Sequence, residues 1–266
     1  MNGNDLPVAC TIAGSDSGGG AGIQADLKTF AALGVWGCTV ITAVTAQNTR
    51  EVRGSWVLPP EAVSCQIGAV VSDFPIRAFK TGMLANEEII RAVADALPFE
   101  GALVIDPVMI ATSGARLLAE DAVGALVSCL LPRAVLVTPN IPEAQVLAGM
   151  DTIGSVEEMV TAGRRICARG ASAVLVKGGH LAGEESIDVL VEGDRVTRFS
   201  GERYPGQVHG TGCCLSAAIT ASLARGRTVA EACGDARSFV ACAIREAVVS
   251  AGGRRMVNPR PARQGR

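Results

Sequence analysis

Short apolar runs alternate with helix-like segments along almost the whole chain, and this alternation constrains the fold more than any other feature. Clear examples of the apolar runs are residues 8–13, 35–44, 102–105 and 173–176. The two shorter runs are continuously apolar, and only threonine and glycine interrupt the two longer ones. This pattern is typical of strands that are buried on both faces. The sequence therefore predicts an α/β fold of three layers, in which helices cover both faces of a mostly parallel central sheet.

No linker or internal repeat interrupts this alternation, so we predict a single domain over residues 1–266, with a loose tail from about residue 253. The composition is 48% hydrophobic and only 3% aromatic, so Ala, Val, Leu and Ile must build the core. A net charge of −2 argues against a nucleic-acid-binding surface. No apolar run is long enough to span a membrane, so no membrane partner is expected.

The cysteines indicate a reducing compartment. There are nine of them, an odd number, and no Cys-x-x-Cys pair occurs. No signal-peptide pattern precedes them, so we expect reduced thiols in a cytoplasmic protein. Only two histidines are present, and a zinc site is therefore not expected.

A glycine-rich stretch at residues 206–212 leads directly into a breaker-free helical segment. Gly210 and Gly212 permit backbone conformations that other residues avoid. The first turn of the helix would present unpaired N–H groups and the positive end of the helix dipole, which together bind anions. Cys213 lies in this turn, where the same field is expected to favour its thiolate.

Polar residues repeatedly follow the predicted strands. They are Asp16, Gln47, Asp106, Asn140 and Lys177. Because parallel strands end at the same edge of a sheet, and ligands of such sheets bind there, these side chains predict a functional site.

Phosphoryl transfer fits these residues. The helix start, comprising Gly210, Thr211, Gly212 and Cys213, would hold the anion, and Lys177 would add a positive charge. Asp106 and Glu143 are candidates to hold Mg²⁺ through water.

A dehydrogenase is the alternative from another class. Residues 20–25 fit Gly-x-Gly-x-x-Ala after a strand, as in an NAD-dependent oxidoreductase. Such an enzyme needs a carboxylate at the end of the second strand, where this chain has Ala46-Gln47-Asn48. The fingerprint is therefore weak.

A series of ordered motifs resembles the ribokinase-like superfamily and, within it, the hydroxymethylpyrimidine/phosphomethylpyrimidine kinases of thiamine biosynthesis. The resemblance extends from about residue 11 to residue 243. The motifs are Ala13-Gly14-Ser15-Asp16, Gly22-Ile23-Gln24-Ala25-Asp26, Ala46-Gln47-Asn48-Thr49, Lys80-Thr81-Gly82-Met83-Leu84, Asp106-Pro107-Val108-Met109, Thr138-Pro139-Asn140-Ile141-Pro142-Glu143, Lys177-Gly178-Gly179-His180 and His209-Gly210-Thr211-Gly212-Cys213.

This resemblance implies ATP- and Mg²⁺-dependent phosphorylation of 4-amino-5-hydroxymethyl-2-methylpyrimidine to its monophosphate and then its diphosphate. It also implies that the chain can form a homodimer, although no interface is recognisable. Lys177, Asn140 and Thr211 would bind the nucleotide. The residues that would line the pyrimidine pocket are Gly14, Asp26, Gln47, Met83 and Val108.

Two alternatives stay open within the resemblance. Some pyridoxal kinases share the cysteine at the helix start, so pyridoxal is the rival acceptor. Cys213 is either the base that takes the hydroxyl proton or a residue that only shapes the anion site.

Overall fold

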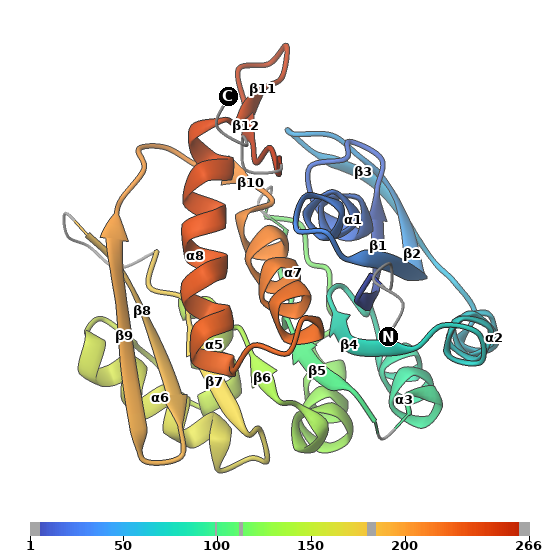
Figure 1. Ribbon diagram of the computed structural model, residues 1–266, viewed down its shortest axis with the longest axis horizontal. Helices are drawn as coiled ribbons and strands as arrows, with labels where there is room; N and C mark the ends of the chain where they lie inside the picture. The colour runs from blue at the N-terminus through green and yellow to red at the C-terminus, as the bar shows by residue number, and fades with distance from the viewer. Residues whose placement is uncertain (1–5, 99, 112–113, 180–184, 261–266) are drawn as a thin grey trace.

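A nine-stranded sheet runs through the part of the chain that the structure describes (Figure 1). This computed structural model describes residues 6–98, 100–111, 114–179 and 185–260. In spatial order the strands are β3 (Val52–Val57), β2 (Trp36–Gln47), β1 (Val8–Asp16), β4 (Ile76–Thr81), β5 (Ala102–Ile105), β6 (Leu136–Val137), β7 (Ala173–Val176), β8 (Glu185–Glu192) and β9 (Arg195–Glu202). The strands from β2 to β7 in this order are parallel. At the edges, β3 pairs antiparallel with β2, β8 with β7, and β9 with β8.

Helices cover both faces of this sheet (Figure 1). One face carries α1 (Gly22–Ala32), α7 (Thr211–Ala224) and α8 (Val229–Arg245). The other carries α2 (Pro60–Val71), α3 (Glu87–Ala96), α4 (Ala122–Ala125), α5 (Ile141–Ala148) and α6 (Val156–Cys167). A π-helical turn (Leu126–Leu130) and a 3₁₀ turn (Leu131–Arg133) continue α4. The predicted three-layer fold is confirmed.

The central strands β5, β6 and β7 are apolar without interruption because both of their faces are buried. In β5, Leu103 and Ile105 belong to the core under α2 to α6, whereas Val104 belongs to the core under α7 and α8. Successive side chains of a strand point to opposite faces, so each residue of such a strand must be apolar. Within the described residues, no helix combines the length and the apolarity needed to span a bilayer.

The edge strand β3 is not apparent in the sequence pattern. Its segment reads Val-Arg-Gly-Ser-Trp-Val, and most of it is exposed. Pairing with β2, rather than burial, holds it in place. An edge strand of this kind lacks the apolar run by which the central strands are recognised.

The expected loose tail is wrong for residues 255–257. A small sheet places β12 (Arg255–Met256) between β10 (Val208–His209) and β11 (Val248–Val249). The next residue, Val257, is buried, and its N–H donates to the carbonyl oxygen of His209 at 3.0 Å. The chain therefore returns to the strand that leads into α7. Residues 261–266 of the predicted tail lie outside the described residues.

Candidate active site

A cavity of about 1260 Å³ opens at the edge of the sheet where the parallel strands end. Its lining includes every site residue that the sequence predicted except Asp26. These residues are Gly14, Gln47, Met83, Asp106, Val108, Asn140, Glu143, Lys177, Gly210, Thr211, Gly212 and Cys213. The concentration of polar residues at one edge of the sheet is therefore confirmed.

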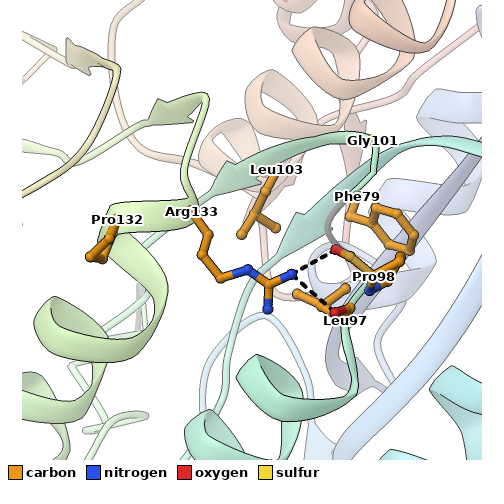
Figure 2. A pocket seen from close by; sticks show the side chains of 7 residues that line it. All are labelled: Phe79, Leu97, Pro98, Gly101, Leu103, Pro132 and Arg133. Carbon is orange, nitrogen blue, oxygen red and sulfur yellow. Dashed lines mark hydrogen bonds between the residues drawn. The ribbon is translucent and has the colours of Figure 1, made fainter.

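A second cavity, of about 260 Å³, lies at the opposite edge, beside the start of β5 (Figure 2). Its polar side chain is Arg133, which donates to the carbonyl oxygens of Leu97 and Pro98 at 3.0 and 2.6 Å and also to that of Ala94. A cation that satisfies carbonyls at the end of α3 stabilises that helix. We therefore assign this cavity a structural role.

Two helices start at the main cavity without a side-chain cap. Gly210 precedes α7 with a φ of 85°, and Ala21 precedes α1. A side chain at Gly210 would meet the carbonyl oxygen of Gly20, because an added Cβ would lie only 1.8 Å from it. The backbone N–H of Gly22, the first residue of α1, donates to the sulfur of Cys213. The two N-termini therefore converge on Cys213, which is the arrangement expected of an anion site.

The expectation of a thiolate at Cys213 is not supported by the surroundings of this residue. Burial raises the pKa of its thiol to about 11, and the charges of Asp26 and Asp106 act in the same direction. The charge of Lys80 and the N–H of Gly22 oppose this rise without overcoming it. The cost of desolvating an anion thus exceeds the gain from the helix field.

Lys177 and Asp106 form an ion pair in the wall of the cavity. Nζ of Lys177 lies 3.1 Å from Oδ1 of Asp106, and Ser216 of α7 donates to Oδ2 at the same distance. Burial alone would raise the pKa of Asp106, but the charges of Lys177 and Lys80 hold it below its usual value. Burial alone would lower the pKa of Lys177, but Asp106 and Glu143 raise it. Both side chains are therefore charged.

Asn140 and Glu143 form a capping box at the start of α5. Oδ1 of Asn140 accepts from the N–H of Glu143 at 2.9 Å, and Oε2 of Glu143 accepts from the N–H of Asn140 at the same distance. Burial raises the pKa of Glu143 to about 7, opposed by Lys177 and reinforced by Asp106. The sequence signal for this motif is the Asn-x-x-Glu spacing.

The two carboxylates fit a hydrated Mg²⁺ better than a closed metal site. Asp106 and Glu143 line the same cavity, and the charge of Asp106 helps to raise the pKa of Glu143. In the described parts of the chain, no cluster of three or more His, Cys, Asp or Glu side chains is arranged to hold a metal ion. Mg²⁺ commonly keeps several waters and binds through one or two carboxylates together with phosphate oxygens, which matches this pair.

Gly14 and Met83 contact each other at the part of the cavity near β1. A Cβ added at Gly14 would lie 3.0 Å from Sδ of Met83, so the glycine leaves room for this side chain. Oε1 of Gln47, at the end of β2, accepts from Thr45 at 3.1 Å. Val108 lines the same cavity, so the two apolar side chains of Met83 and Val108 and the amide of Gln47 all belong to its wall.

Asp26 lies beneath the cavity and is not in its lining. Nζ of Lys80 is 2.8 Å from both carboxylate oxygens, and Thr11 donates to Oδ2 at 2.6 Å. In this structure Asp26 therefore does not line the cavity with the other residues predicted for the pyrimidine pocket, and its contact with the pyrimidine stays a prediction. Its early position in α1 turns the carboxylate towards β4 instead of the cavity.

Two residues at or beside the cavity were assigned no individual role from the sequence. Lys80 lines the cavity from β4, and Ser216 contacts Asp106 from the second turn of α7. Lys80 follows an apolar run, as Lys177 does, and this placement is the signal that could have identified it. Ser216 gives no such signal, because a serine inside a helix is ordinary. His180, which closes one of the motifs, lies outside the described residues.

Comparisons with known proteins identify the family of this chain. A family model described as phosphomethylpyrimidine kinase matches residues 16–258. The chain is 52% identical over 239 residues to a hydroxymethylpyrimidine/phosphomethylpyrimidine kinase from Rhizobium meliloti, and the alignment covers 89% of this chain and 90% of that one.

Solved structures of two kinds also match. A phosphomethylpyrimidine kinase from Clostridium difficile has a TM-score of 0.80 and 43% identity, covering 90% of this chain and 100% of that one. A pyridoxal kinase from Staphylococcus aureus, in complex with AMP-PCP and pyridoxal, has a TM-score of 0.90 and 33% identity, covering 98% and 96%. The resemblance drawn from the motifs is confirmed, and the chain belongs to the phosphomethylpyrimidine kinase family.

Proposed function

We propose that this chain transfers the γ-phosphoryl group of ATP to the hydroxymethyl group of 4-amino-5-hydroxymethyl-2-methylpyrimidine, and then phosphorylates the monophosphate, in thiamine biosynthesis. The observation that carries the proposal is the convergence of two uncapped helix N-termini, Cys213 and the Lys177–Asp106 pair on one cavity. The relatives with this name support the same acceptor. The match to this family leaves the dehydrogenase alternative without support.

The acceptor would bind beside β1. Met83 and Val108 offer apolar surfaces to a flat ring, and the amide of Gln47 can both donate to and accept from its amine and ring nitrogens. Gly14 allows the ring to approach the backbone. Asp26 is omitted from this set, because it lies beneath the cavity in its pair with Lys80.

The nucleotide phosphates would bind at the start of α7. Thr211 and Gly212 supply N–H donors there, Lys177 supplies a positive charge, and Asn140 lies beside it at the start of α5. Asp106 and Glu143 would hold Mg²⁺, which neutralises phosphate charge when it is bound. This assignment would place the γ-phosphoryl group of ATP between the start of α7 and the acceptor hydroxyl.

Cys213 would take the proton of that hydroxyl. The O–H bond breaks as the oxygen attacks the γ-phosphorus, the proton moves to the thiolate sulfur, and the bond to the ADP oxygen breaks. A pKa of about 11 leaves little thiolate at neutral pH, so this role depends on any group that stabilises the anion. If the transition state needs no base, Cys213 only shapes the anion site.

A competition assay tests the acceptor. The purified chain receives Mg-ATP with the aminopyrimidine alcohol and pyridoxal at equal concentrations, and both phosphorylated products are quantified. We expect faster transfer to the aminopyrimidine. Pyridoxal is the second candidate, because pyridoxal kinases are among the similar structures. Faster transfer to pyridoxal would overturn the proposed acceptor while leaving the phosphoryl-transfer site intact.

The cellular setting belongs to the same proposal. All nine cysteines are free, which supports a cytoplasmic location. The continuous sheet supports a single domain. Exposed Val44, Trp56 and Val57 on β2 and β3 support a homodimer, which gel filtration with light scattering would test.

A further inference from the structure

Lys80 and Asp26 form an ion pair with no solvent exposure on either side chain. Nζ of Lys80 lies 2.8 Å from both carboxylate oxygens, and the hydroxyl of Thr11 donates to Oδ2 at 2.6 Å. Burial alone would lower the pKa of Lys80, but the negative groups around it raise it, so the side chain is a cation. A positive charge, paired with the carboxylate of Asp26, is therefore held at the wall of the cavity.

A pair in this position is costly to bury. The cost of desolvating two ions commonly offsets their mutual attraction, so the stability of the fold alone gives little reason for this pair.

Lysine is rare in this chain, with three examples among 24 basic residues. Lys80 and Lys177 line the main cavity, and Nζ of Lys28 donates to the carbonyl of Gly19 in the adjoining loop at 2.6 Å. All three lysines therefore lie at the main cavity or at the loop beside it.

The pair lies against the start of α7. Gly22, Asp26 and Thr29 are spaced four and three residues apart, so they share one face of α1. The N–H of Gly22 donates to the sulfur of Cys213, and the hydroxyl of Thr29 lies 3.5 Å from the sulfur of Cys214. Asp26 thus occupies the turn of α1 between two residues that contact adjacent cysteines.

We propose that Lys80, oriented by Asp26, is a positioning residue that favours the anionic form of Cys213. The inference rests on the proposed function, in which Cys213 takes the hydroxyl proton. Lys80 donates no hydrogen bond to substrate in this role. It supplies a fixed charge in a region of low dielectric constant, where the effect of a charge is large.

The other charges facing Cys213 agree with this role. Lys80 lowers the pKa of the thiol, whereas Asp26 and Asp106 raise it, and the N–H of Gly22 lowers it. Lys177 interacts with the same sulfur from the nucleotide side. Lys80 has the largest effect among these charged groups.

The test measures the ionisation of the thiol directly. Cys213 of the full chain is alkylated with iodoacetamide between about pH 7.5 and 9, where the rate is proportional to the thiolate fraction. Tandem mass spectrometry separates Cys213 from Cys214, and Cys213→Ser confirms the assignment. We expect Lys80→Met to raise the thiol pKa by about one unit and to slow alkylation about tenfold. Arg77→Met, which removes an exposed cation from the same strand, should leave the rate unchanged.

Lys80→Met leaves Asp26 unpaired and can prevent folding, so the double variant Lys80→Met/Asp26→Leu accompanies it. The double variant should slow alkylation by less than Lys80→Met does, because the opposing carboxylate is also removed. Rates equal to wild type in a folded Lys80 variant would overturn the inference. The readout uses neither ATP nor acceptor, so a failure of the proposed kinase activity would be seen separately.

Discussion

Oδ2 of Asp16 lies 3.2 Å from Nε2 of His209, and this contact joins the glycine loop after β1 to the strand that leads into α7. The same carboxylate accepts N–H groups from Gly18, Gly20 and Ala21 at 2.8 to 3.1 Å. One side chain therefore orders the loop and ties it to the anion site.

Asp16→Asn tests this link. The amide keeps one acceptor oxygen but loses the charge, so we expect kcat/KM for the acceptor to fall about 10- to 100-fold, which corresponds to about 1.4 to 2.7 kcal/mol of lost transition-state stabilisation. Steady-state kinetics measure the change. The matched control is Asp194→Asn, in the exposed turn between β8 and β9, which should leave kcat/KM unchanged.

Asp16→Asn should also change how the stability of the protein depends on pH. Burial alone would raise the pKa of Asp16, but the hydrogen bonds from His209, Gly18 and Ala21 lower it below its usual value. The stability from this carboxylate is therefore present above its unfolded pKa of about 3.9 and is lost as pH falls through the lower folded value. Thermal unfolding from neutral to acidic pH should show this loss in the wild type only. If the melting temperatures of wild type and Asp16→Asn fell in parallel with pH, this assignment to Asp16 would be contradicted.

The sequence predicted most of the site because its residues follow uninterrupted apolar runs. Asp106 and Lys177 come directly after such a run, Asn140 comes three residues after one, and parallel strands bring their ends together. The placement of Asp26 depends on a partner from another element, and helical position alone did not show that Lys80 would hold it below the cavity. Likewise, Arg255 and Met256 have no strand pattern of their own, and only pairing with β10 orders them.

Cys213→Ala separates a base from a residue that shapes the anion site. If the thiolate takes the proton, kcat should fall about 10²- to 10⁴-fold, the usual range for general base catalysis. A decrease in kcat of less than about tenfold would contradict the base role, and Cys213 would then only shape the anion site. The neighbouring Cys214 is fully buried in the core under α7 and α8, so Cys214→Ala should change stability with little effect on kcat. Initial-rate kinetics and thermal unfolding of both variants give the comparison.

The free energy of unfolding of Glu143→Gln, relative to that of wild type, should be higher at alkaline than at acidic pH. Burial raises the pKa of Glu143 from 4.5 to about 7, so the folded protein holds this proton more tightly than the unfolded chain does. The resulting stability is present below the unfolded pKa and is lost as pH rises through about 7. Relative to wild type, the variant should gain on the order of 3 kcal/mol in the free energy of unfolding between about pH 5 and 8.

The control for this change is the capping box of α8. Glu231 occupies the same position relative to Thr228 as Glu143 does to Asn140, but it is exposed, and its hydrogen bonds to Thr228 lower its pKa. Glu231→Gln should therefore show no change in relative stability between about pH 6 and 8, because the wild-type carboxylate is ionised throughout. Chemical denaturation at several pH values measures both variants. An equal pH dependence for the two would contradict the assignment of the shift to burial at the site.

Truncation after Gly252 should impair the anion site while leaving the main sheet folded. It removes β12 and Val257, whose N–H donates to the carbonyl of His209, and it removes Met256, whose Sδ lies 3.2 Å from the position of a Cβ at Gly20. Both contacts hold the segments that adjoin Gly210. We expect kcat/KM for ATP to fall at least about tenfold, since misplacing groups that bind a transferring phosphoryl affects its transition state directly. Truncation after Arg260 keeps these contacts and should retain wild-type kinetics. Equal kinetics for the two truncated proteins would show that the C-terminal strand does not support the site.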